Sequence, residues 1–285
     1  MSIPTILTAG EVASIEAAAV RIRKDILRMV KAGGAGHVGG AFSCTDIMAA
    51  LYFSVLRVDP ENPKWPERDR LILSAGHKCM ALYGSLRQRG FFDESLLDTY
   101  GALGSRLPGH PVMQKLPGVE ANTGALGHGL SIGGGMAMGL KAQKSASRVF
   151  VIMGDGELAE GSSWEAAAAA AHHRLDNLTV FVDRNKLQLS GKTTEIMSYE
   201  PLADKWAAFG WSVRTIDGHD IRAVVDSAQG APFVADKPSV VIADTVKAKG
   251  LSFGEGLVDF HYWKPKYEEM QRAEAELTAL EESLK

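Results

Sequence analysis

The amino-acid sequence predicts an α/β fold, an open and mostly parallel sheet with helices on both faces. Short apolar runs rich in β-branched residues recur along the chain and alternate with longer segments of helical periodicity. These runs are apolar on both faces, which is typical of parallel strands that helices cover on both sides. Strands and helices that alternate in this way form β–α–β units and therefore an open sheet.

The predicted strands are short segments bounded by polar or glycine residues. All of them are expected to be apolar on both faces, because a covered parallel sheet buries both sides of each strand. In chain order they are Arg70–Leu73, Val149–Met153, Leu178–Asp183, Ser212–Ile216 and Val240–Val246.

The predicted helices lie before, between and after these strands. The first runs from about Glu11 to Ala32, and Thr8 stands three residues before Glu11, the spacing of a capping box. The last, Lys266–Leu284, is rich in Glu, Ala and Leu, and we expect one side of it to face solvent. The others are Cys44–Leu56, Lys78–Arg89, His128–Ala142, Ser163–His173, Leu202–Phe209 and Ile221–Ala228.

Two glycine-rich stretches, Gly33–Gly40 and Leu103–Pro111, show no regular pattern and are predicted to be loops. Such loops inside a compact domain are often functional, and ligands of open α/β sheets bind at the carboxyl ends of the strands. Gly33–Gly40 has a simpler interpretation as the stop of the preceding helix. The sequence contains no internal repeat, low-complexity tract or linker, so we expect one domain over residues 1–285.

Composition restricts the partners that the chain is expected to have. The chain has 285 residues, of which 46% are hydrophobic, and its 31 Lys and Arg nearly balance its 34 Asp and Glu. This balance argues against nucleic acid and membrane surfaces as partners. Cys44 and Cys79 give neither a disulfide framework nor a metal pair, and no secretion signal or membrane span is visible. We therefore expect a cytoplasmic protein that binds small molecules or another protein.

The strongest local motif is the Gly-Asp-Gly of Gly154–Gly156, directly after the predicted strand Val149–Met153. Glycine on both sides of the acid lets the backbone turn tightly and approach a ligand closely. The next predicted strand is followed by Asn185, so neighbouring strand ends offer a carboxylate and an amide oxygen. With a backbone carbonyl and a diphosphate, Asp155 and Asn185 would satisfy Mg²⁺, which prefers hard oxygen ligands. The helix that follows suits an anion at its N-terminus.

Gly-Asp-Gly followed about thirty residues later by Asn resembles the thiamine diphosphate-binding motif. The run Gly154–Gly161, followed by Trp164–Ala166, resembles the transketolase family in particular. The sequence departs from that family at Val38, where proline is usual, and at His128, where glutamine is usual. Further segments that resemble it are Ala35–Gly39, Asp69–His77, Pro108–Pro111, Thr123–Gly129, Lys247–Gly250 and His261.

The resemblance implies that the chain binds thiamine diphosphate and magnesium. It makes Asp155, Asn185 and the carbonyl of Leu187 the metal ligands, and calcium or manganese can substitute for magnesium at such a site. Gly124 and Leu126 would meet the aminopyrimidine of the cofactor. The full set of cofactor-binding residues that it implies is His77, Gly124, Leu126, Gly154, Asp155, Gly156, Glu157, Asn185 and His261.

The resemblance also implies which residues take part in catalysis. His77, His261 and the Gly156 amide would bind the diphosphate, because an imidazole N–H donates to phosphate at close range. Several histidines would line the channel to the reactive carbon of the cofactor and move protons, since their pKa lies near neutral pH. Glu160 would lie near a subunit interface, in an acidic network that links paired sites. The implied catalytic residues are His37, His77, His110, His261 and Glu160.

Some of these residue types also have simpler interpretations. Glu157 and Glu165 stand where an acid at a helix start interacts favourably with the helix dipole. His128 could belong only to the first turn of a helix. The remaining histidines, for which we expect ordinary structural roles, are His172, His173 and His219.

The implied activity is the transfer of a two-carbon ketol unit from a ketose phosphate to an aldose. Transketolases continue beyond the cofactor domain with a pyrimidine-binding domain and a third domain, and the sequence has no counterpart of either. We therefore expect a second subunit that carries both, sugar phosphates as substrates, and a heterotetramer with paired sites.

Several other functions share the cofactor motif. A 1-deoxyxylulose-5-phosphate synthase has a similar layout but lacks the acid at Glu160. The α subunit of a 2-oxoacid dehydrogenase has a similar motif but not this set of histidines. A non-catalytic protein that binds thiamine diphosphate is a further alternative, against which the intact Asp155, Asn185 and histidine set argue.

Overall fold

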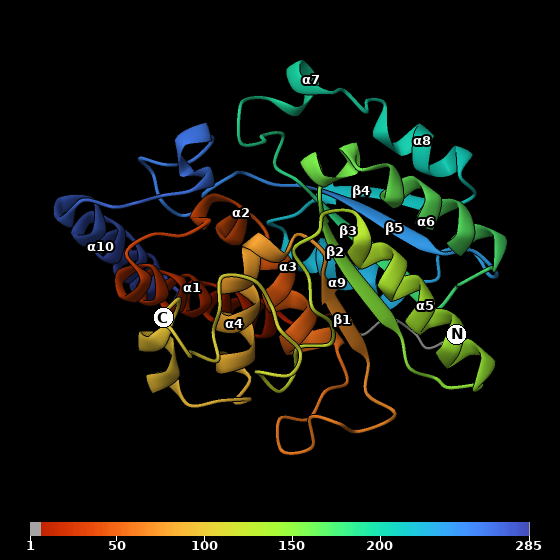
Figure 1. Ribbon diagram of the computed structural model, residues 1–285, viewed down its shortest axis with the longest axis horizontal. Helices are drawn as coiled ribbons and strands as arrows, with labels where there is room; N and C mark the ends of the chain where they lie inside the picture. The colour runs from red at the N-terminus through yellow and green to blue at the C-terminus, as the bar shows by residue number, and fades with distance from the viewer. Residues whose placement is uncertain (1–6, 285) are drawn as a thin grey trace.

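The computed structural model describes residues 7–284 and contains one five-stranded sheet in that range, with strand order β1-β2-β3-β5-β4 (Figure 1). Every strand pair is parallel. The predicted fold class is therefore confirmed, and the predicted strand bounds agree closely with the structure. The strands are β1 Arg70–Leu73, β2 Val149–Gly154, β3 Leu178–Arg184, β4 Ser212–Asp217 and β5 Ser239–Asp244.

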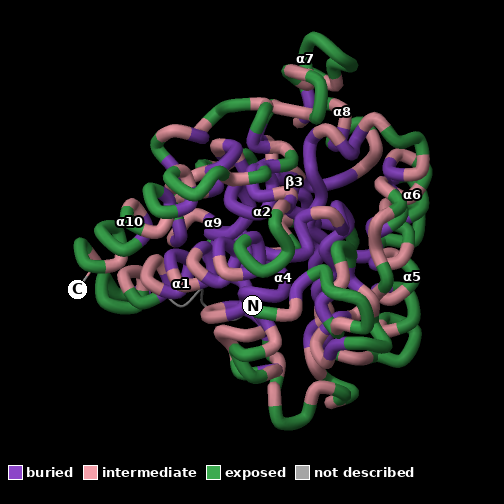
Figure 2. The backbone as a smooth tube through the Cα atoms, turned by 60° about the vertical axis from the view of Figure 1, so that its left-hand side comes forward, coloured by how far each residue is buried: buried purple, intermediate pink, exposed green. Residues whose placement is uncertain are grey.

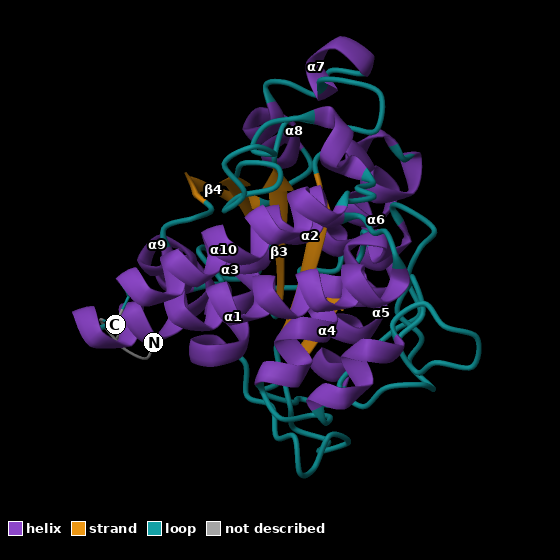
Figure 3. Ribbon diagram, turned by 90° about the vertical axis from the view of Figure 1, so that its left-hand side faces the viewer, coloured by secondary structure: helices purple, strands orange, loops and turns teal. Residues whose placement is uncertain are grey.

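Helices cover both faces of the sheet, as Figures 1 and 3 show. One face carries α1 Ala9–Gly33, α2 Val38–Ser43, α3 Thr45–Ala50, α4 Cys79–Gln88, α9 Ile221–Gly230 and α10 Tyr267–Ser283. The other face carries α5 His128–Ala142, α6 Gly161–His172 and α8 Leu202–Ala208. The short α7 Thr193–Ile196 projects at the top of both views.

Each face of the sheet has its own hydrophobic core, because successive residues of a strand point to opposite sides. On β2, Val151 and Met153 pack toward α5 and α6, while Phe150 and Ile152 pack toward α1 and α4. All four side chains are fully buried. This double coverage explains why the central strands are continuous apolar runs in the sequence.

Shorter helical turns connect these elements. The predicted helix Cys44–Leu56 divides into α3 and a π-helical turn, η1 Leu51–Val55. The remaining turns are 3₁₀ helices that lie in loops, and several of them adjoin the predicted functional residues. They are η2 Gly76–Lys78, η3 Glu94–Thr99, η4 Gly156–Ala159 and η5 Val258–His261.

The first helix begins and ends as the sequence predicts. The Glu11 amide donates to Thr8 Oγ1 at 3.2 Å and the Thr8 amide donates to Glu11 Oε2 at 2.7 Å, which completes the capping box. Gly34 ends α1 with a φ of 78°, a left-handed conformation that glycine adopts without strain. Along its length α1 packs against α10, and Lys24 Nζ lies 2.6 Å from Glu281 Oε2.

Two predictions about local structure were wrong. Residues 38–40 are not an irregular loop, because they begin α2; a Cβ on Gly39 would lie 2.6 Å from the Phe260 carbonyl oxygen, so glycine serves close packing there. The strand β4 is not apolar on both faces, since Arg214 and Thr215 are exposed. It is an edge strand, and its position in the sheet order leaves it partly uncovered.

No helix within residues 7–284 has both the length and the apolar character that a membrane crossing requires.

Candidate cofactor and metal site

A cavity of about 300 Å³ lies at the carboxyl edge of the sheet, beyond the ends of β1, β2 and β3. This volume falls in the range typical of small-molecule and cofactor sites. Every residue predicted to bind the cofactor or the metal lines the cavity, and so does His37. The remaining lining residues are Gly40, Ala75, Lys78, Gln188, Leu189 and Lys247.

The predicted metal ligands lie on adjacent strand ends. Residues 153 and 182 are register partners in β2 and β3, which brings Asp155 and Asn185 to the same edge of the sheet. Asp155 Oδ1 accepts from the Gly156 amide at 2.9 Å, and Asp155 Oδ2 accepts from the Lys186 amide at 2.7 Å. Burial, together with the nearby Asp183 carboxylate, raises the pKa of Asp155 to about 6. A cation bound beside this carboxylate would offset the free-energy cost of ionising it in a buried position.

These residues fit a magnesium ion in the chemistry of their donors. Asp155, the Asn185 amide oxygen and the Leu187 carbonyl are hard oxygen donors around one cavity. Mg²⁺ is commonly bound by one or two carboxylates together with other oxygen ligands, phosphate and water. The Lys247 ammonium lies 3.4 Å from the Leu187 carbonyl oxygen and 3.3 Å from that of Gln188. A positive charge therefore already lies against one of the predicted metal ligands.

Three of the predicted histidines form a cluster in the cavity. The ring centroids of His37 and His77 are 5.1 Å apart, those of His37 and His261 are 5.4 Å apart, and those of His77 and His261 are 5.6 Å apart. Burial and the Lys78 charge lower the pKa of His77 to about 2, and burial with Lys247 lowers that of His261 to about 4. The expectation that these histidines have a pKa near neutral pH is therefore wrong for His77 and His261. At neutral pH both rings are neutral, each with one N–H that donates and one nitrogen that accepts.

His110 and Glu160 do not line the cavity. His110 is exposed, and a Cβ on Gly124 would lie 3.0 Å from its Cδ2, so the ring lies against a cavity-lining residue at the rim. The Tyr83 hydroxyl donates to the His110 carbonyl at 3.1 Å and holds this loop in place. Glu160 is exposed at the N-terminus of α6, next to Gly127.

The Glu157 carboxylate links three elements beneath the cavity. It accepts from the Gly127 amide at 2.8 Å, from the Gly154 amide at 3.1 Å and from the Ser74 hydroxyl. Burial raises the pKa of Glu157, and the hydrogen bonds oppose that shift. Both oxygens are thus engaged by the ends of β1 and β2 and by the start of α5.

Two buried lysines of the cavity were not predicted. Lys78 is 3% exposed and its Nζ lies 2.6 Å from Asp183 Oδ2, while Lys247 is 1% exposed and its Nζ lies 3.2 Å from His261 Nδ1. Burial, then the Lys78 charge, lowers the pKa of Lys247 to about 8. The sequence does carry a signal for both, because Lys78 follows His77 directly and Lys247 begins the segment Lys247–Gly250.

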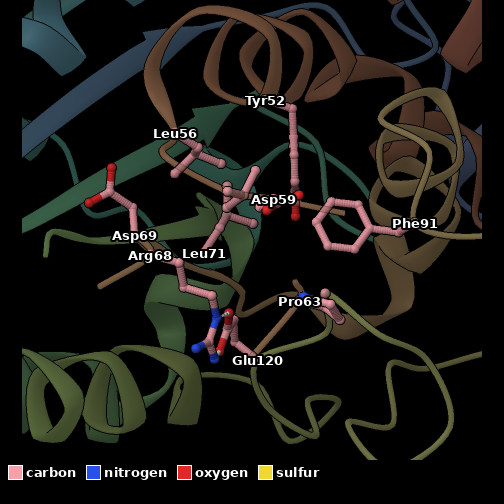
Figure 4. A pocket seen from close by; sticks show the side chains of 11 residues that line it. Tyr52, Leu56, Asp59, Pro63, Arg68, Asp69, Leu71, Phe91 and Glu120 are labelled. Carbon is pink, nitrogen blue, oxygen red and sulfur yellow. Dashed lines mark hydrogen bonds and ion pairs between the residues drawn. The ribbon is translucent and has the colours of Figure 1, made fainter. Parts of the chain in front are cut away.

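A second, much smaller cavity lies at the other end of the sheet, beside the start of β1 (Figure 4). Its volume is about 10 Å³, roughly the space of one water molecule. Arg68 and Glu120 face each other at its edge, with two hydrogen bonds of 2.7 Å, and Tyr52 and Phe91 line its apolar side. It has no room for an organic ligand.

Comparison with known proteins gives matches along most of the chain. Residues 15–279 match the family described as "Transketolase, thiamine diphosphate binding domain". A subunit of the apulose-4-phosphate transketolase of Phocaeicola vulgatus is 42% identical over 274 residues, 96% of this chain and 97% of that protein. The 6-deoxy-6-sulfo-D-fructose transketolase subunit SqwG of Clostridium sp. is 45% identical over 256 residues, 90% of this chain and 93% of that protein.

Solved transketolases have the same fold as this chain. The enzyme from Leishmania mexicana superposes with a TM-score of 0.87 at 29% identity, over 93% of this chain and 41% of its own. The enzyme from Campylobacter jejuni gives a TM-score of 0.86 at 32% identity, over 93% of this chain and 42% of its own. The chain thus spans about two fifths of the solved transketolases and nearly all of the Phocaeicola vulgatus relative. It belongs to the transketolase family and corresponds to the thiamine diphosphate-binding domain of that family.

Proposed function

We propose that this chain is the cofactor-binding subunit of a two-chain transketolase, which moves a two-carbon ketol unit from a ketose to an aldose. The observation that carries the proposal is the meeting of His37, His77 and His261 with Asp155 and Asn185 in one cavity. Proton-moving groups and hard oxygen ligands thus share a space of cofactor size.

In this proposal the chain holds thiamine diphosphate and magnesium together. Asp155, Asn185 and the Leu187 carbonyl would bind the metal. The Gly156 amide, with His77 and His261, would donate hydrogen bonds to the diphosphate, and Lys247 adds a positive charge on the same side. The aminopyrimidine would lie against Gly124 and Leu126. When bound, the cofactor supplies the nucleophilic carbon and the electron sink that allow a ketose carbon–carbon bond to break.

The histidine cluster would orient the sugar and move its protons. Burial lowers the pKa of both His37 and His261, so their rings are neutral at neutral pH. Each ring can therefore donate to a carbonyl oxygen and accept from a hydroxyl. The proposed role of His110 is contact with the sugar from the rim of the cavity. Glu160 is proposed to lie near a subunit boundary, which agrees with its exposure at the N-terminus of α6.

A second subunit is part of the proposal. The chain is proposed to be a single domain over residues 1–285, and the pyrimidine-binding and C-terminal domains would come from the partner, in a heterotetramer. The matches to proteins that are themselves named as transketolase subunits support this. So does the outer side of α5 and α6, which is largely exposed (Figure 2). The groove between these helices measures about 350 Å³ and is lined mainly by small or apolar residues, among them Gly135, Met138 and Ala169.

The substrate is proposed to be a ketose with an anionic end group. The relatives are named for apulose 4-phosphate and for 6-deoxy-6-sulfo-D-fructose, which carry a phosphate and a sulfonate respectively. These names favour a specialised sugar over the general pentose phosphate exchange that the resemblance alone would suggest. Most of the residues that bind the anionic end group would come from the second subunit. The proposed acceptor is an aldose or aldose phosphate.

The test is a ketol-transfer assay with thiamine diphosphate and magnesium, using the chain alone and then together with the co-expressed product of the neighbouring gene. Xylulose 5-phosphate is offered as donor with ribose 5-phosphate as acceptor. Apulose 4-phosphate and 6-deoxy-6-sulfofructose are offered with glyceraldehyde 3-phosphate as acceptor, and pyruvate is offered in a separate reaction. We expect transfer only by the pair. Transfer by the chain alone would contradict the two-chain proposal, and consumption of pyruvate would contradict the reaction.

Asp155→Ala is the matched variant for the metal assignment. Loss of the carboxylate should abolish the magnesium-dependent binding of thiamine diphosphate by the assembled protein, measured by calorimetric titration. The Asp176→Ala variant removes a carboxylate that ion-pairs with Lys141 away from the cavity, and it should bind normally. If thiamine diphosphate binding by Asp155→Ala depended on magnesium as in the wild type, the assignment of Asp155 as a metal ligand would be wrong.

A further inference from the structure

Asp183 is fully buried, two residues before the proposed metal ligand Asn185. Its Oδ2 atom accepts from Lys78 Nζ at 2.6 Å and from Ser43 Oγ at 2.6 Å, and its Oδ1 atom accepts from the Thr245 hydroxyl. These partners come from η2, from α2 and from the loop after β5. One carboxylate therefore joins separate elements directly beneath the cavity.

The network is balanced in charge. A buried carboxylate is costly unless a cation and hydrogen bonds satisfy it, and Lys78 supplies the cation. Asp183 is 0% exposed and Lys78 is 3% exposed, so water screens neither. The ammonium group lies near the cavity, because its Nζ would be 3.2 Å from a Cβ placed on Gly154.

The same network determines which way the Asn185 amide points. Asn185 Nδ2 donates to Ser43 Oγ at 3.3 Å and to Asp183 Oδ2 at 3.4 Å, while Oδ1 accepts from the Leu187 amide at 3.1 Å. An ionised carboxylate only accepts hydrogen bonds, so the NH₂ group and not the oxygen of the amide must face Asp183. The oxygen is consequently turned to the side of the Leu187 loop, whose carbonyl is the third proposed metal ligand.

We infer that Asp183, with Lys78 as its counter-charge, is a positioning residue that fixes the Asn185 amide with its oxygen toward the metal. The inference rests on the proposed metal site and extends it to residues that touch neither metal nor cofactor. Groups behind a metal ligand typically change metal affinity by about 10- to 100-fold when they are removed. The effect should be larger for Mg²⁺ than for Ca²⁺, because Mg²⁺ demands near-ideal octahedral geometry and Ca²⁺ tolerates irregular sites.

The test uses a double variant, Lys78→Met with Asp183→Asn, which removes both charges and so leaves no buried ion unpaired. Mg²⁺ and Ca²⁺ are titrated calorimetrically into the full chain, assembled with its second subunit, in the presence of thiamine diphosphate. We expect Mg²⁺ affinity to fall by about 10- to 100-fold and Ca²⁺ affinity to fall less. Equal losses for both ions, or wild-type affinity for Mg²⁺, would overturn the inference.

A matched control removes another ion pair at the same edge of the sheet. Arg184 lies between Asp183 and Asn185, and its guanidinium bonds Asp244 at 2.8 Å, without a hydrogen bond to Asn185. The double variant Arg184→Met with Asp244→Asn should therefore keep the wild-type ratio of Mg²⁺ to Ca²⁺ affinity. A change in this ratio as large as in the first double variant would overturn the inference, because it would trace the effect to charge at the edge.

A second variant serves if the first does not fold. Ser43→Ala removes one acceptor of the Asn185 amide and leaves the Lys78–Asp183 ion pair intact, so we expect a smaller selective loss of Mg²⁺ affinity. Wild-type Mg²⁺ affinity in this variant would overturn the inference. Failure of the proposed function is distinct from both results, because the unmodified assembly would then bind no Mg²⁺ with thiamine diphosphate.

Discussion

At the scale of single residues, His219 shows how a side chain outside the cavity fixes a segment that lines the cavity. Its Nδ1 atom lies 2.6 Å from Asp46 Oδ2, and its Nε2 atom accepts from the Val246 amide at 2.9 Å. The imidazole therefore carries its proton on Nδ1 and ties α3 to the segment that bears Lys247. The sequence predicted only an ordinary structural role for it, and the contact with the residue before Lys247 gives that role a specific purpose.

We predict that His219→Ala destabilises the protein by about 1–3 kcal/mol, because it leaves the Val246 amide without its acceptor and removes a donor to Asp46. Urea unfolding measures the change. His173→Ala, at an exposed position after α6, should alter stability by no more than about 0.5 kcal/mol. Equal stability of the two variants would show that the His219 bonds contribute nothing.

A second residue-scale prediction concerns Asp25 on α1. Burial raises the pKa of Asp25 to about 6, although the 2.7 Å hydrogen bond from Gln88 Nε2 and the charge of Arg87 both act to lower it. The folded-state pKa lies above the unfolded value of 3.8, so the folded protein binds the proton more tightly. Stability from this group is therefore present at low pH, is lost as pH rises from about 4 to 6, and stays lost above that range.

Asp25→Asn should consequently raise the free energy of unfolding by about 1–2 kcal/mol at pH 7, and the gain should vanish toward pH 4. Urea unfolding at pH 4, 5, 6 and 7 tests this dependence. Asp98→Asn changes an exposed carboxylate that pairs with Arg28, and it should bring no such gain at any pH. A gain in Asp25→Asn that does not depend on pH would contradict the account.

At the scale of elements, the sequence predicted what depends on local pattern. The strands β2 and β3 are continuous apolar runs because helices bury both faces, and that pattern is visible in the sequence. The exposure of Arg214 on β4 was not predictable, since it depends on where the strand stands in the sheet. The start of α2 was missed for a related reason, because Gly39 and Gly40 are required by packing against Phe260 and Lys78 and not by a turn.

The candidate site divides in the same way. Asp155, Asn185 and the histidines stand in motifs that a sequence can reveal. The Lys78–Asp183 pair and the three bonds of Glu157 depend on side chains that meet from separate elements, and no local spacing predicts such meetings.

Helix α5 gives an element-scale prediction through its glycines. A Cβ on Gly133 would lie 2.5 Å from Val151 Cγ2 of β2, while a Cβ on Gly139 would meet nothing within 4 Å. Gly133→Ala should therefore destabilise the protein by about 1–3 kcal/mol through overpacking. Gly139→Ala should stabilise it by up to about 1 kcal/mol, because alanine favours helix. Thermal unfolding measures the stability of both variants. The prediction requires that Gly133→Ala lowers the stability and that Gly139→Ala raises it.

At the scale of the whole molecule, the two helical layers have different surfaces. Between α1 and α10 charged side chains pair across the surface, as in the 3.0 Å contact of Lys31 with Glu274 and the 2.6 Å contact of Lys24 with Glu281. The outer side of α5 and α6 is largely exposed (Figure 2), and many of its exposed residues are glycine or alanine. A surface of small residues lets another helix approach closely, which supports this side as the contact with other subunits.

We predict that Ala169→Lys on α6 weakens assembly with the second subunit by about 10-fold or more, because the contact would bury an unpaired charge. The stability of the chain by itself should change by no more than about 0.5 kcal/mol. Sedimentation velocity of the co-expressed proteins measures the assembly. Ala279→Lys is the control at an exposed position of α10, on the other side of Figure 1. Equal assembly of the two variants would contradict the proposed contact.

The pairing of α1 with α10 has a consequence for how the protein is made. Lys24 and Glu281 are 257 positions apart in the chain, and Met270, Ala273 and Leu277 of α10 are buried in the same core as α1. A ribosome therefore releases nearly the whole chain before the outer side of α1 is covered. During synthesis the apolar surface of this first helix therefore stays exposed to solvent and to chaperones until α10 is made. The packing of α1 against α10 is a late step of folding.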